Sequence, residues 1–313
     1  MTSSIPFRLG TRGSDLALWQ AHHIARMIFD QLGIGCTIKI IKTRGDRDQD
    51  VAFQKMEGKG FFTKELQDAL IGGQIDLVVH SLKDLPTEEP EGLEIAAIPE
   101  RAEAADLLLA RRDFLERDHA DPFGLPEGAV LGTSSLRRAS QALASSPKIS
   151  VRALRGNVPT RIRKLRDGDY DAILLAAAGV RRLDLETDDL ECVKLPPEVM
   201  LPAPGQGALA IETRSNDEMT RPLSALHDPS IARCVGAERR LLELLGGGCH
   251  LPLGCLAEED KTGLRLQAVL GEIDDEVTEA TVSRVGSLAQ DPESAARVCF
   301  EALRLAMPEI VGK

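Results

Sequence analysis

Apolar runs and amphipathic stretches alternate along the first 80 residues and predict a strand–helix–strand order. Residues 7–12 and 36–42 are typical of strands, and residues 15–32 and 61–72 are typical of amphipathic helices. Residues 77–79 form a short apolar run without polar alternation, which is typical of a strand buried on both faces. This order predicts right-handed parallel crossovers and an α/β fold.

The same alternation returns further along the chain. Strands are predicted at 94–98, 106–110, 130–131, 149–154 and 172–176, with helices at 135–144 and 158–166. Beyond the proline-rich stretch at 195–204, the pattern predicts a strand at 208–211, helices at 218–226 and 231–245, strands at 264–270 and 277–282, and a helix at 292–307. The pattern therefore indicates two α/β units followed by a small α+β domain.

A cluster of polar residues directly follows the buried run at 77–79. It contains His80, Ser81, Lys83 and Asp84. Ligands of parallel sheets bind outside the carboxyl ends of the strands, so these side chains fall where chemistry is expected. A simpler interpretation also stands, in which Lys83 and Asp84 are a solvated pair on a loop.

Three predicted helix starts combine capping residues with arginine. Ser14 or Asp15 can cap the first helix, whose free N–H groups form an anion site next to Arg12. Residues 133–138 place hydroxyls at a helix start with two arginines in the first turn, where the helix dipole disfavours cations unless an anion lies among them. Residues 154–161 repeat this arrangement one crossover later.

Charge is unevenly distributed along this acidic chain of 313 residues, whose formal net charge is −11. No Asp or Glu lies between Gly128 and Arg166. The basic residues of this stretch, called the basic island below, are Arg137, Arg138, Lys148, Arg152, Arg155, Arg161, Arg163, Lys164 and Arg166. A solvated surface normally mixes both signs, so the basic island predicts a polyanionic ligand. The alternative is a basic surface patch that binds nothing.

Composition excludes several other classes of function. The acidic net charge and an aromatic content of 3% argue against nucleic-acid binding. Six scattered cysteines without a C-x-x-C pair predict neither a disulfide framework nor a zinc site, and six dispersed histidines predict no metal centre. The sequence shows no membrane-spanning apolar run and no secretion signal, so we expect a cytoplasmic protein without a membrane partner. Nothing in the sequence indicates an obligate interface, and we expect a monomer.

A run of three glycines precedes Cys249. Gly246, Gly247 and Gly248 permit backbone conformations that other residues avoid, and they allow a group to approach closely. A cysteine that merely fills a core has no need of such neighbours. Cys249 is therefore a candidate for chemistry.

Taken together, seven motifs closely resemble the porphobilinogen deaminase family. They are Thr11-Arg12-Gly13-Ser14, the 55–62 loop, His80-Ser81-Leu82-Lys83-Asp84-Leu85-Pro86, Gly132-Thr133-Ser134-Ser135-Leu136-Arg137-Arg138, Leu154-Arg155-Gly156-Asn157, Pro202-Ala203-Pro204-Gly205-Gln206-Gly207 and Gly247-Gly248-Cys249. The resemblance spans residues from about 7 to 260 in the right order. Beyond Asp260 it is only general.

The resemblance implies a transferase that joins four porphobilinogen units head to tail into a linear tetrapyrrole and releases ammonia each time. It also implies three domains, of which the first two are built like periplasmic binding proteins. On this basis we expect domain 1 at 1–100 with 200–220, domain 2 at 101–199, and an α+β domain 3 at 221–313. The cofactor that the resemblance implies is a dipyrromethane, attached through a thioether to Cys249.

The same resemblance assigns roles to individual residues. Asp84 is implied as the catalytic carboxylate, which stabilises the positive charge left on a pyrrole when ammonia departs. The implied cofactor- and substrate-binding residues are Arg12, Ser14, Ser81, Lys83, Thr133, Ser134, Ser135, Arg137, Arg138, Arg155, Gly156, Arg161, Arg182 and Gln206. Lys55, Lys59 and Phe62 are expected on a mobile loop. Arginines suit the acetate and propionate groups of a growing pyrrole chain, because guanidinium binds carboxylate in bidentate fashion.

One alternative function stays open at this stage. The two α/β units alone would also describe a non-enzymatic, two-lobed anion-binding module. The third domain with its Gly-Gly-Gly-Cys sequence favours the enzyme.

Overall fold

The computed structural model describes residues 5–43, 63–112, 114–116, 121–248 and 251–311. Lys55, Lys59, Phe62 and Cys249, which the sequence analysis singles out, lie outside these ranges. The chain divides into two compact units. The first unit contains residues 1–102 and 207–232, and the second unit contains residues 103–206 and 233–313.

The first unit is built on a five-stranded mixed sheet. Its strands are β1 (Phe7–Thr11), β2 (Cys36–Ile40), β3 (Leu77–Ser81), β4 (Leu93–Ala97) and β10 (Leu209–Arg214), in the order β2-β1-β3-β10-β4. β1, β2 and β3 are parallel, whereas β10 runs antiparallel to both of its neighbours. Its helices are α1 (Asp15–Leu32), α3 (Lys64–Ile71) and the short 3₁₀ helices η2 (Leu82–Asp84) and η3 (Arg221–Leu226).

Helices α1 and α3 cover opposite faces of this sheet. Leu77 and Val79 share a buried cluster with Ile24 of α1, whereas Val78 shares one with Leu66 of α3. Successive side chains of a strand point to opposite faces, so this division follows from the period of two. The apolar run of β3 is therefore fully buried between two helix layers.

The second unit contains a second five-stranded sheet. Its strands are β5 (Asp106–Arg111), β6 (Val130–Gly132), β7 (Ser150–Arg152), β8 (Ala172–Ala176) and β9 (Leu190–Lys194), in the order β7-β6-β8-β5-β9. The helices α4 (Leu136–Ser145), α5 (Val158–Arg166) and α6 (Ala177–Arg182) follow β6, β7 and β8 along the chain.

The two five-stranded sheets share one topology. In each, three parallel strands are followed by two strands that pair antiparallel, so β2, β1, β3, β10 and β4 correspond to β7, β6, β8, β5 and β9. The registers correspond as well. Gly10 of β1 lies beside Val78 of β3, and Gly132 of β6 lies beside Ile173 of β8.

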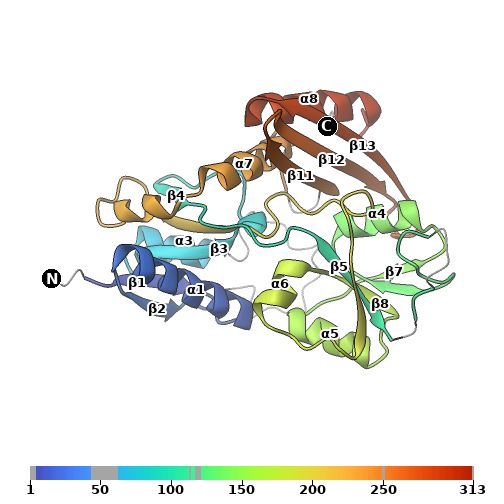
Figure 1. Ribbon diagram of the computed structural model, residues 1–313, viewed down its shortest axis with the longest axis horizontal. Helices are drawn as coiled ribbons and strands as arrows, with labels where there is room; N and C mark the ends of the chain where they lie inside the picture. The colour runs from blue at the N-terminus through green and yellow to red at the C-terminus, as the bar shows by residue number, and fades with distance from the viewer. Residues whose placement is uncertain (1–4, 44–62, 113, 117–120, 249–250, 312–313) are drawn as a thin grey trace. The chain divides into compact units, whose positions relative to one another are not determined.

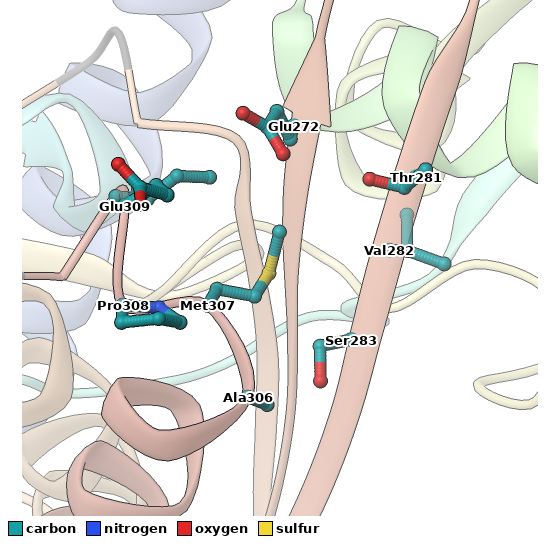
Figure 2. Close-up of a pocket in the computed structure, with 9 residues that line it drawn as sticks. Glu272, Thr281, Val282, Ser283, Ala306, Met307, Pro308 and Glu309 are labelled. Atoms are coloured by element: carbon teal, nitrogen blue, oxygen red, sulfur yellow. The ribbon is translucent and has the colours of Figure 1, made fainter.

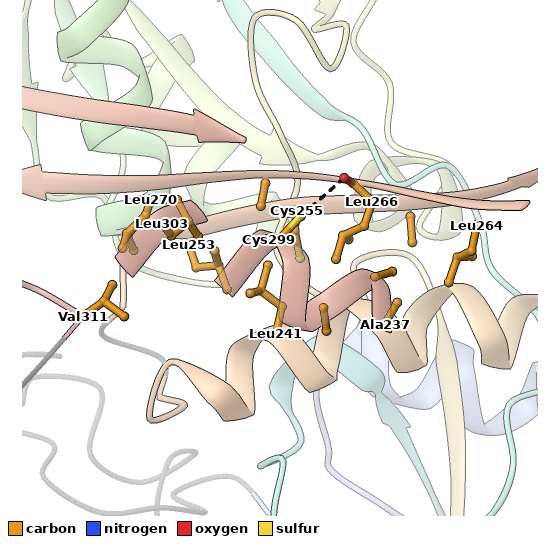
Figure 3. Close-up of a cluster of buried hydrophobic side chains, with 14 of the residues drawn as sticks. Ala237, Leu241, Leu253, Cys255, Leu264, Leu266, Leu270, Cys299, Leu303 and Val311 are labelled. Atoms are coloured by element: carbon orange, nitrogen blue, oxygen red, sulfur yellow. Dashed lines mark hydrogen bonds between the residues drawn. The ribbon is translucent and has the colours of Figure 1, made fainter. Parts of the chain in front are cut away.

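A three-stranded antiparallel sheet completes the second unit. It contains β11 (Leu253–Asp260), β12 (Gly263–Ile273) and β13 (Ala280–Ala289), and it is followed by α8 (Pro292–Ala306) (Figure 1). Its core packs alternate residues of β12 against α8 and α7 (Pro229–Leu244), as Figure 3 shows. The Cys299 thiol in this core donates to the Leu266 carbonyl oxygen at 3.6 Å.

Helix α4 packs on the other face of this small sheet. A Cβ atom on Gly271 would lie 2.3 Å from the Ser140 hydroxyl oxygen, so only glycine permits the close approach of α4 to β12. Arg284 of β13 donates to the Val199 carbonyl oxygen at 3.2 Å, which adds a polar contact between the small sheet and the segment before residue 201. The two sheets of the second unit are therefore joined through α4.

The predicted α/β class is confirmed, and most predicted elements are present within a few residues. Three predictions differ from the structure. The helix predicted at 218–226 is a 3₁₀ helix that starts only at Arg221, and the strand predicted at 277–282 starts at Ala280. The Asp274 carboxylate accepts bonds from the backbone of Thr278 and Glu279, which makes the start of that segment a turn. The sheets are also mixed, because β10 and β5 run against their parallel neighbours.

Four elements are absent from the predictions. They are the three-residue helix η2 and the elements α6, β9 and β11. β9 is an edge strand of mostly exposed residues, and β11 ends in an acidic run, so neither shows an apolar pattern. α6 spans only six residues, too few for a helical period to be visible.

Candidate active site

The site residues of the first unit follow the neighbouring parallel strands β1 and β3. Arg12 and Ser14 come directly after β1, and Lys83 and Asp84 follow β3 within η2. The carboxyl ends of neighbouring parallel strands meet at one edge of the sheet, so this topology brings the four residues to the same edge. The Asp84 side chain is exposed there.

The turn that carries Asp84 is held from two directions. The Gln20 side chain of α1 donates to the Ser81 hydroxyl oxygen at 2.8 Å. The Leu82 N–H donates to the Ala208 carbonyl oxygen at 3.0 Å, and the Leu85 N–H donates to the Leu82 carbonyl oxygen at 3.1 Å. Ser81 therefore fixes the turn to α1, and an exposed carboxylate projects from a fixed backbone.

Ser14 caps α1 from the same sheet edge. Its backbone is extended, and its hydroxyl accepts from the Ala17 N–H at 3.4 Å. Thr11 donates from its hydroxyl to the Ala17 carbonyl oxygen at 3.0 Å and ties the end of β1 to the first turn of the helix. Capping accounts for Ser14, but it gives no reason for the half-buried Arg12 beside it.

The hydroxyl residues of the second unit follow β6. The Ser134 hydroxyl donates to the Leu154 carbonyl oxygen at 2.9 Å, and the Thr133 hydroxyl accepts from the Ser135 N–H at 3.2 Å. Ser135 occupies the N-cap position of α4, but its side chain makes no capping bond. The first turn of α4 therefore leaves its N–H groups without the side-chain cap that this position usually supplies.

Arg137 and Arg138 converge on Asp106, the first residue of β5. Arg137 Nη1 lies 2.6 Å from Asp106 Oδ2, and Arg138 Nη2 lies 2.7 Å from Asp106 Oδ1. The two arginines are 5% and 6% exposed, and Asp106 is 0% exposed. Burial by itself raises the pKa of Asp106, but the two guanidinium groups outweigh it and hold this pKa well below its usual range. Burial also lowers the pKa of Arg137, against the effect of Asp106.

Gln206 joins this buried cluster from the connecting segment at 201–206. Its side-chain amide donates to Asp106 Oδ1 at 3.0 Å and to the Ala104 carbonyl oxygen at 2.6 Å. Arg137 Nη1 also donates to the Leu201 carbonyl oxygen at 2.8 Å. Both ends of the connecting segment are therefore bonded to the arginine cluster or to its counter-ion.

The connecting segment is also bonded to the three-stranded sheet. Glu238 of α7, 0% exposed, accepts from the Gly205 N–H at 2.7 Å and from the Ala257 N–H at 2.8 Å. The Cys255 N–H donates to the Pro202 carbonyl oxygen at 2.8 Å. Thus α4 and β5 hold one side of the connecting segment, while α7 and β11 hold the other.

The basic island is partly neutralised by acids from outside it. Besides the Asp106 cluster, Lys148 pairs with Glu127 at 2.8 Å and Arg166 pairs with Asp189 at 2.6 Å. The Arg152 guanidinium lies over the Tyr170 ring at 4.6 Å. Part of the positive charge of the basic island is therefore paired within the protein. This agrees with the alternative interpretation, in which the basic island binds no ligand.

Arg155, Gly156 and Arg161 lie where β7 leads into α5. Asn157 caps α5 by accepting from the Thr160 N–H at 2.9 Å, and Arg161 Nε donates to the Gly156 carbonyl oxygen at 2.8 Å. Gly156 has a φ of +112°, and a Cβ atom there would lie 2.6 Å from a methyl carbon of Thr160. Glycine is therefore required at this helix start. Arg182 lies buried at the end of α6, which follows β8.

Sequence reasoning missed Asp106, Glu238 and Gln20. Asp106 precedes an apolar run as a lone acid, and Glu238 and Gln20 lie within amphipathic helices. Their partners are 31, 33 and 61 positions away in the sequence. The one local signal was the acid at the head of the predicted strand 106–110, because buried acids require cationic or hydrogen-bonding partners.

A cavity of about 350 Å³ lies elsewhere in the second unit, between the ends of β12 and β13 and the end of α8 (Figure 2). Two carboxylates, Glu272 and Glu309, line it. None of the predicted site residues lines this cavity, and its acids would repel a polyanion. It is not a candidate for the predicted site.

Among the residues that the structure describes, no group of three or more His, Cys, Asp and Glu side chains could hold a metal ion. No described helix is long and apolar enough to cross a membrane.

Comparison with known proteins gives matches along most of the chain. Residues 7–222 match the family model "Porphobilinogen deaminase, dipyromethane cofactor binding domain", and residues 232–304 match "Porphobilinogen deaminase, C-terminal domain". The porphobilinogen deaminase of Oceanobacillus iheyensis is 46% identical over 85% of this chain and 84% of its own length. That of Helicobacter hepaticus is 45% identical, over 84% of this chain and 80% of its own length. That of Thiobacillus denitrificans is 43% identical over 94% of both chains.

Among solved structures, an ancestral cationic amino acid solute-binding protein matches with a TM-score of 0.44 and 15% identity. The match covers 70% of this chain and 88% of that one.

Proposed function

The chain belongs to the porphobilinogen deaminase family, and from this premise we propose which of its residues carry the reaction. The resemblance drawn from the motifs is confirmed. The chain is a transferase that polymerises porphobilinogen into a linear tetrapyrrole, and its cofactor is a dipyrromethane. The alternative of a non-enzymatic two-lobed binding module is not favoured, because the C-terminal domain of the family is matched as well.

The residues present fit a cofactor that carries several carboxylates. Arg137 bonds to Asp106 and Leu201 through Nη1, and among the described residues its Nε and Nη2 make no hydrogen bond. The Nε–Nη2 edge of a guanidinium is suited to bidentate binding of a carboxylate. The start of α4, with Thr133, Ser134 and Ser135, adds hydroxyls and N–H groups, which are typical anion ligands.

We assign the binding of cofactor and growing chain to two sets of residues. In the first unit these are Arg12, Ser14, Ser81 and Lys83. In the second unit they are Thr133, Ser134, Ser135, Arg137, Arg138, Arg155, Gly156, Arg161, Arg182 and Gln206. When bound, the dipyrromethane supplies the pyrrole carbon to which the first substrate unit is joined. The guanidinium groups neutralise the acetate and propionate side chains and thereby orient the rings.

Asp84 is the proposed catalytic carboxylate. The observation that carries this assignment is an exposed carboxylate on a turn that Gln20 and Ala208 hold in place through Ser81 and Leu82. A fixed carboxylate can accept hydrogen bonds from pyrrole N–H groups and stabilise the positive charge that develops as ammonia leaves the substrate. Such preorganised stabilisation is worth several kcal/mol, roughly, in a site shielded from water.

Further assignments complete the proposal. Cys249 is the attachment point of the cofactor. The chain acts as a monomer that binds no nucleic acid. The cytoplasm is the proposed location. The division into three domains, two of them periplasmic-binding-like, is supported by the three separate sheets.

Intact-protein mass and turnover, measured on the same preparations, test these assignments. The purified protein should exceed the mass of its chain by two linked pyrroles, and Cys249→Ser should abolish both this excess and turnover. Asp84→Asn should keep the excess mass but lower turnover by about 10²–10³-fold, the usual effect of removing one preorganised electrostatic group.

Cys192→Ser, which changes an exposed thiol, is the matched control and should retain both mass and turnover. Excess mass that persists in Cys249→Ser would remove Cys249 as the attachment point. Near-normal turnover of Asp84→Asn would remove Asp84 from the mechanism.

A further inference from the structure

A buried histidine–glutamate pair lies beside the turn that carries Asp84, and the reaction described above does not use it. His80 Nε2 of β3 lies 2.8 Å from Glu212 Oε2 of β10. The Gln67 side chain of α3 donates to the other carboxylate oxygen, Oε1, also at 2.8 Å. His80 is 7% exposed and Glu212 is 3% exposed. Three elements of the first unit therefore meet at one buried carboxylate.

The second unit shows that this fold does not require the pair. Val78 lies opposite Glu212, and Val78 corresponds to Ile173, which lies opposite Leu109. Two residues further along each parallel strand, His80 corresponds to Leu175. Leu109 and Leu175 are 0% and 1% exposed, so the second sheet fills the same two positions with apolar side chains.

Polar groups in these positions carry a cost that the leucines avoid. Removing an ionisable pair from water requires desolvation of both groups, and well-packed apolar residues are often equally stable or more stable in its place. What the pair adds is one defined geometry, because each Glu212 oxygen has a single partner on a different element. Apolar contacts do not fix strand positions in this directional way.

The position of the pair indicates what this geometry serves. His80 pairs with Ala210 and Ser81 pairs with Leu209, the last rungs of the ladder before η2. The next residue, Leu82, donates to Ala208 of the same segment. We propose that His80 and Glu212 are positioning residues, which hold β3 on β10 and α3 so that Asp84 projects at its working position. This inference rests on the proposed catalytic role of Asp84.

The test replaces His80 and Glu212 by leucine, the residue that the second unit has at the corresponding positions. The double variant His80→Leu/Glu212→Leu should fold and retain the cofactor mass, with a thermal midpoint lowered by the buried Gln67 amide that loses its acceptor. Its kcat should fall about 10–100-fold with an unchanged KM, since a displacement of about 1 Å can cost a factor of 10² in rate. A folded variant with kcat within twofold of the parent overturns the proposal.

The same substitutions in the Asp84→Asn background separate positioning from a general structural role. If the pair acts through Asp84, the double substitution lowers the residual kcat of Asp84→Asn by less than twofold. A further tenfold loss there contradicts the proposal. High turnover of Asp84→Asn alone would instead refute the assignment of Asp84, so the two failures are distinguishable.

If the leucine variant does not fold, Glu212→Gln tests the positioning role of the pair instead. The amide keeps the size of the side chain, but while its oxygen accepts from Gln67 its nitrogen can only donate, so His80 Nε2 has to accept where it donates to the carboxylate. We expect a kcat loss of several-fold with an unchanged KM, which is absent in the Asp84→Asn background. An unchanged kcat in Glu212→Gln overturns the proposal.

Discussion

The two five-stranded sheets have the same strand order, and the register of β1 on β3 corresponds to that of β6 on β8, but the side chains at their carboxyl edges differ. In the first unit a carboxylate, Asp84, follows the central parallel strand β3. In the second unit hydroxyls and arginines follow β6, and α6 follows the corresponding strand β8. The comparison shows that the topology supplies an edge at which ligands can bind, while the short segments after each strand decide what binds there.

Each unit also contains an aspartate that binds two arginines, but the two clusters differ in place and in burial. Asp76 precedes β3, at the opposite end of that strand from Asp84, and it binds Arg8 and Arg214. Asp106 lies opposite Ala176, at the carboxyl end of β8, and thus at the ligand edge of its sheet. The Arg8 side chain is 47% exposed, whereas the Arg137 side chain is 6% exposed. A cluster of one aspartate and two arginines therefore stabilises the edge opposite Asp84 in the first sheet. In the second sheet, such a cluster stabilises the edge at which ligands are expected.

Asp106→Asn should have the largest effect on this comparison. Loss of the carboxylate leaves two buried guanidinium groups without a counter-ion, which costs about 3–5 kcal/mol in the free energy of unfolding. Asp76→Asn is the matched control and should cost less, because water can reach Arg8. Urea unfolding of both variants measures the difference, and equal losses would show that burial does not distinguish the clusters.

The pH dependence of stability sharpens the same contrast. Burial raises the pKa of Asp106, but Arg137 and Arg138 hold it below its usual range, so the folded protein binds this proton later than the unfolded chain does. The stabilisation is complete above about pH 4, the pKa of an unfolded aspartate, and is lost as pH falls toward the lower folded value. Asp106→Asn should therefore show a shallower loss of stability below pH 4 than the parent.

The corresponding glycines Gly10 and Gly132 allow an intermediate test. A Cβ atom on Gly132 would lie 2.7 Å from the Tyr170 ring, which is packed and rigid. A Cβ atom on Gly10 would lie 2.3 Å from Cδ1 of Ile75, the flexible end of that side chain, and 3.5 Å from the next nearest atoms. Gly132→Ala should destabilise by about 1–3 kcal/mol and Gly10→Ala by less, as thermal unfolding would show. The reverse order would mean that the two sheets tolerate crowding differently than their contacts indicate.

The helix caps give the smallest expected effect. Asn157 accepts from the first turn of α5 at 2.9 Å, whereas Ser14 accepts from that of α1 at 3.4 Å. Asn157→Ala should cost about 1 kcal/mol of stability. The longer bond predicts a smaller loss for Ser14→Ala, which should instead raise KM if Ser14 contacts the substrate. An unchanged KM of Ser14→Ala would assign Ser14 to the fold alone.

Local sequence pattern predicted those parts of the molecule that depend on neighbouring residues. The helix at 15–32 has the predicted bounds, because Ser14 caps it and Gly33 ends it with a φ of +69°. The turn at Asp84 was predicted because an apolar run ends there. The Asp106 cluster and the His80–Glu212 pair could not be predicted, since their partners are 31 and 132 positions apart and only the sheet topology brings them together.

The hydrogen bonds that hold the connecting segment at 201–206 determine how the C-terminal sheet is attached to the rest of the second unit. The carbonyl and N–H groups of this segment are bonded to α4 on one side and to α7 and β11 on the other. A chain cut before Arg233 would lose the acceptor for the Gly205 N–H and, with Cys255, the donor to Pro202. The C-terminal sheet is therefore a structural part of the second unit. Its exchange between relatives would require that these bonds to residues 201–206 be kept.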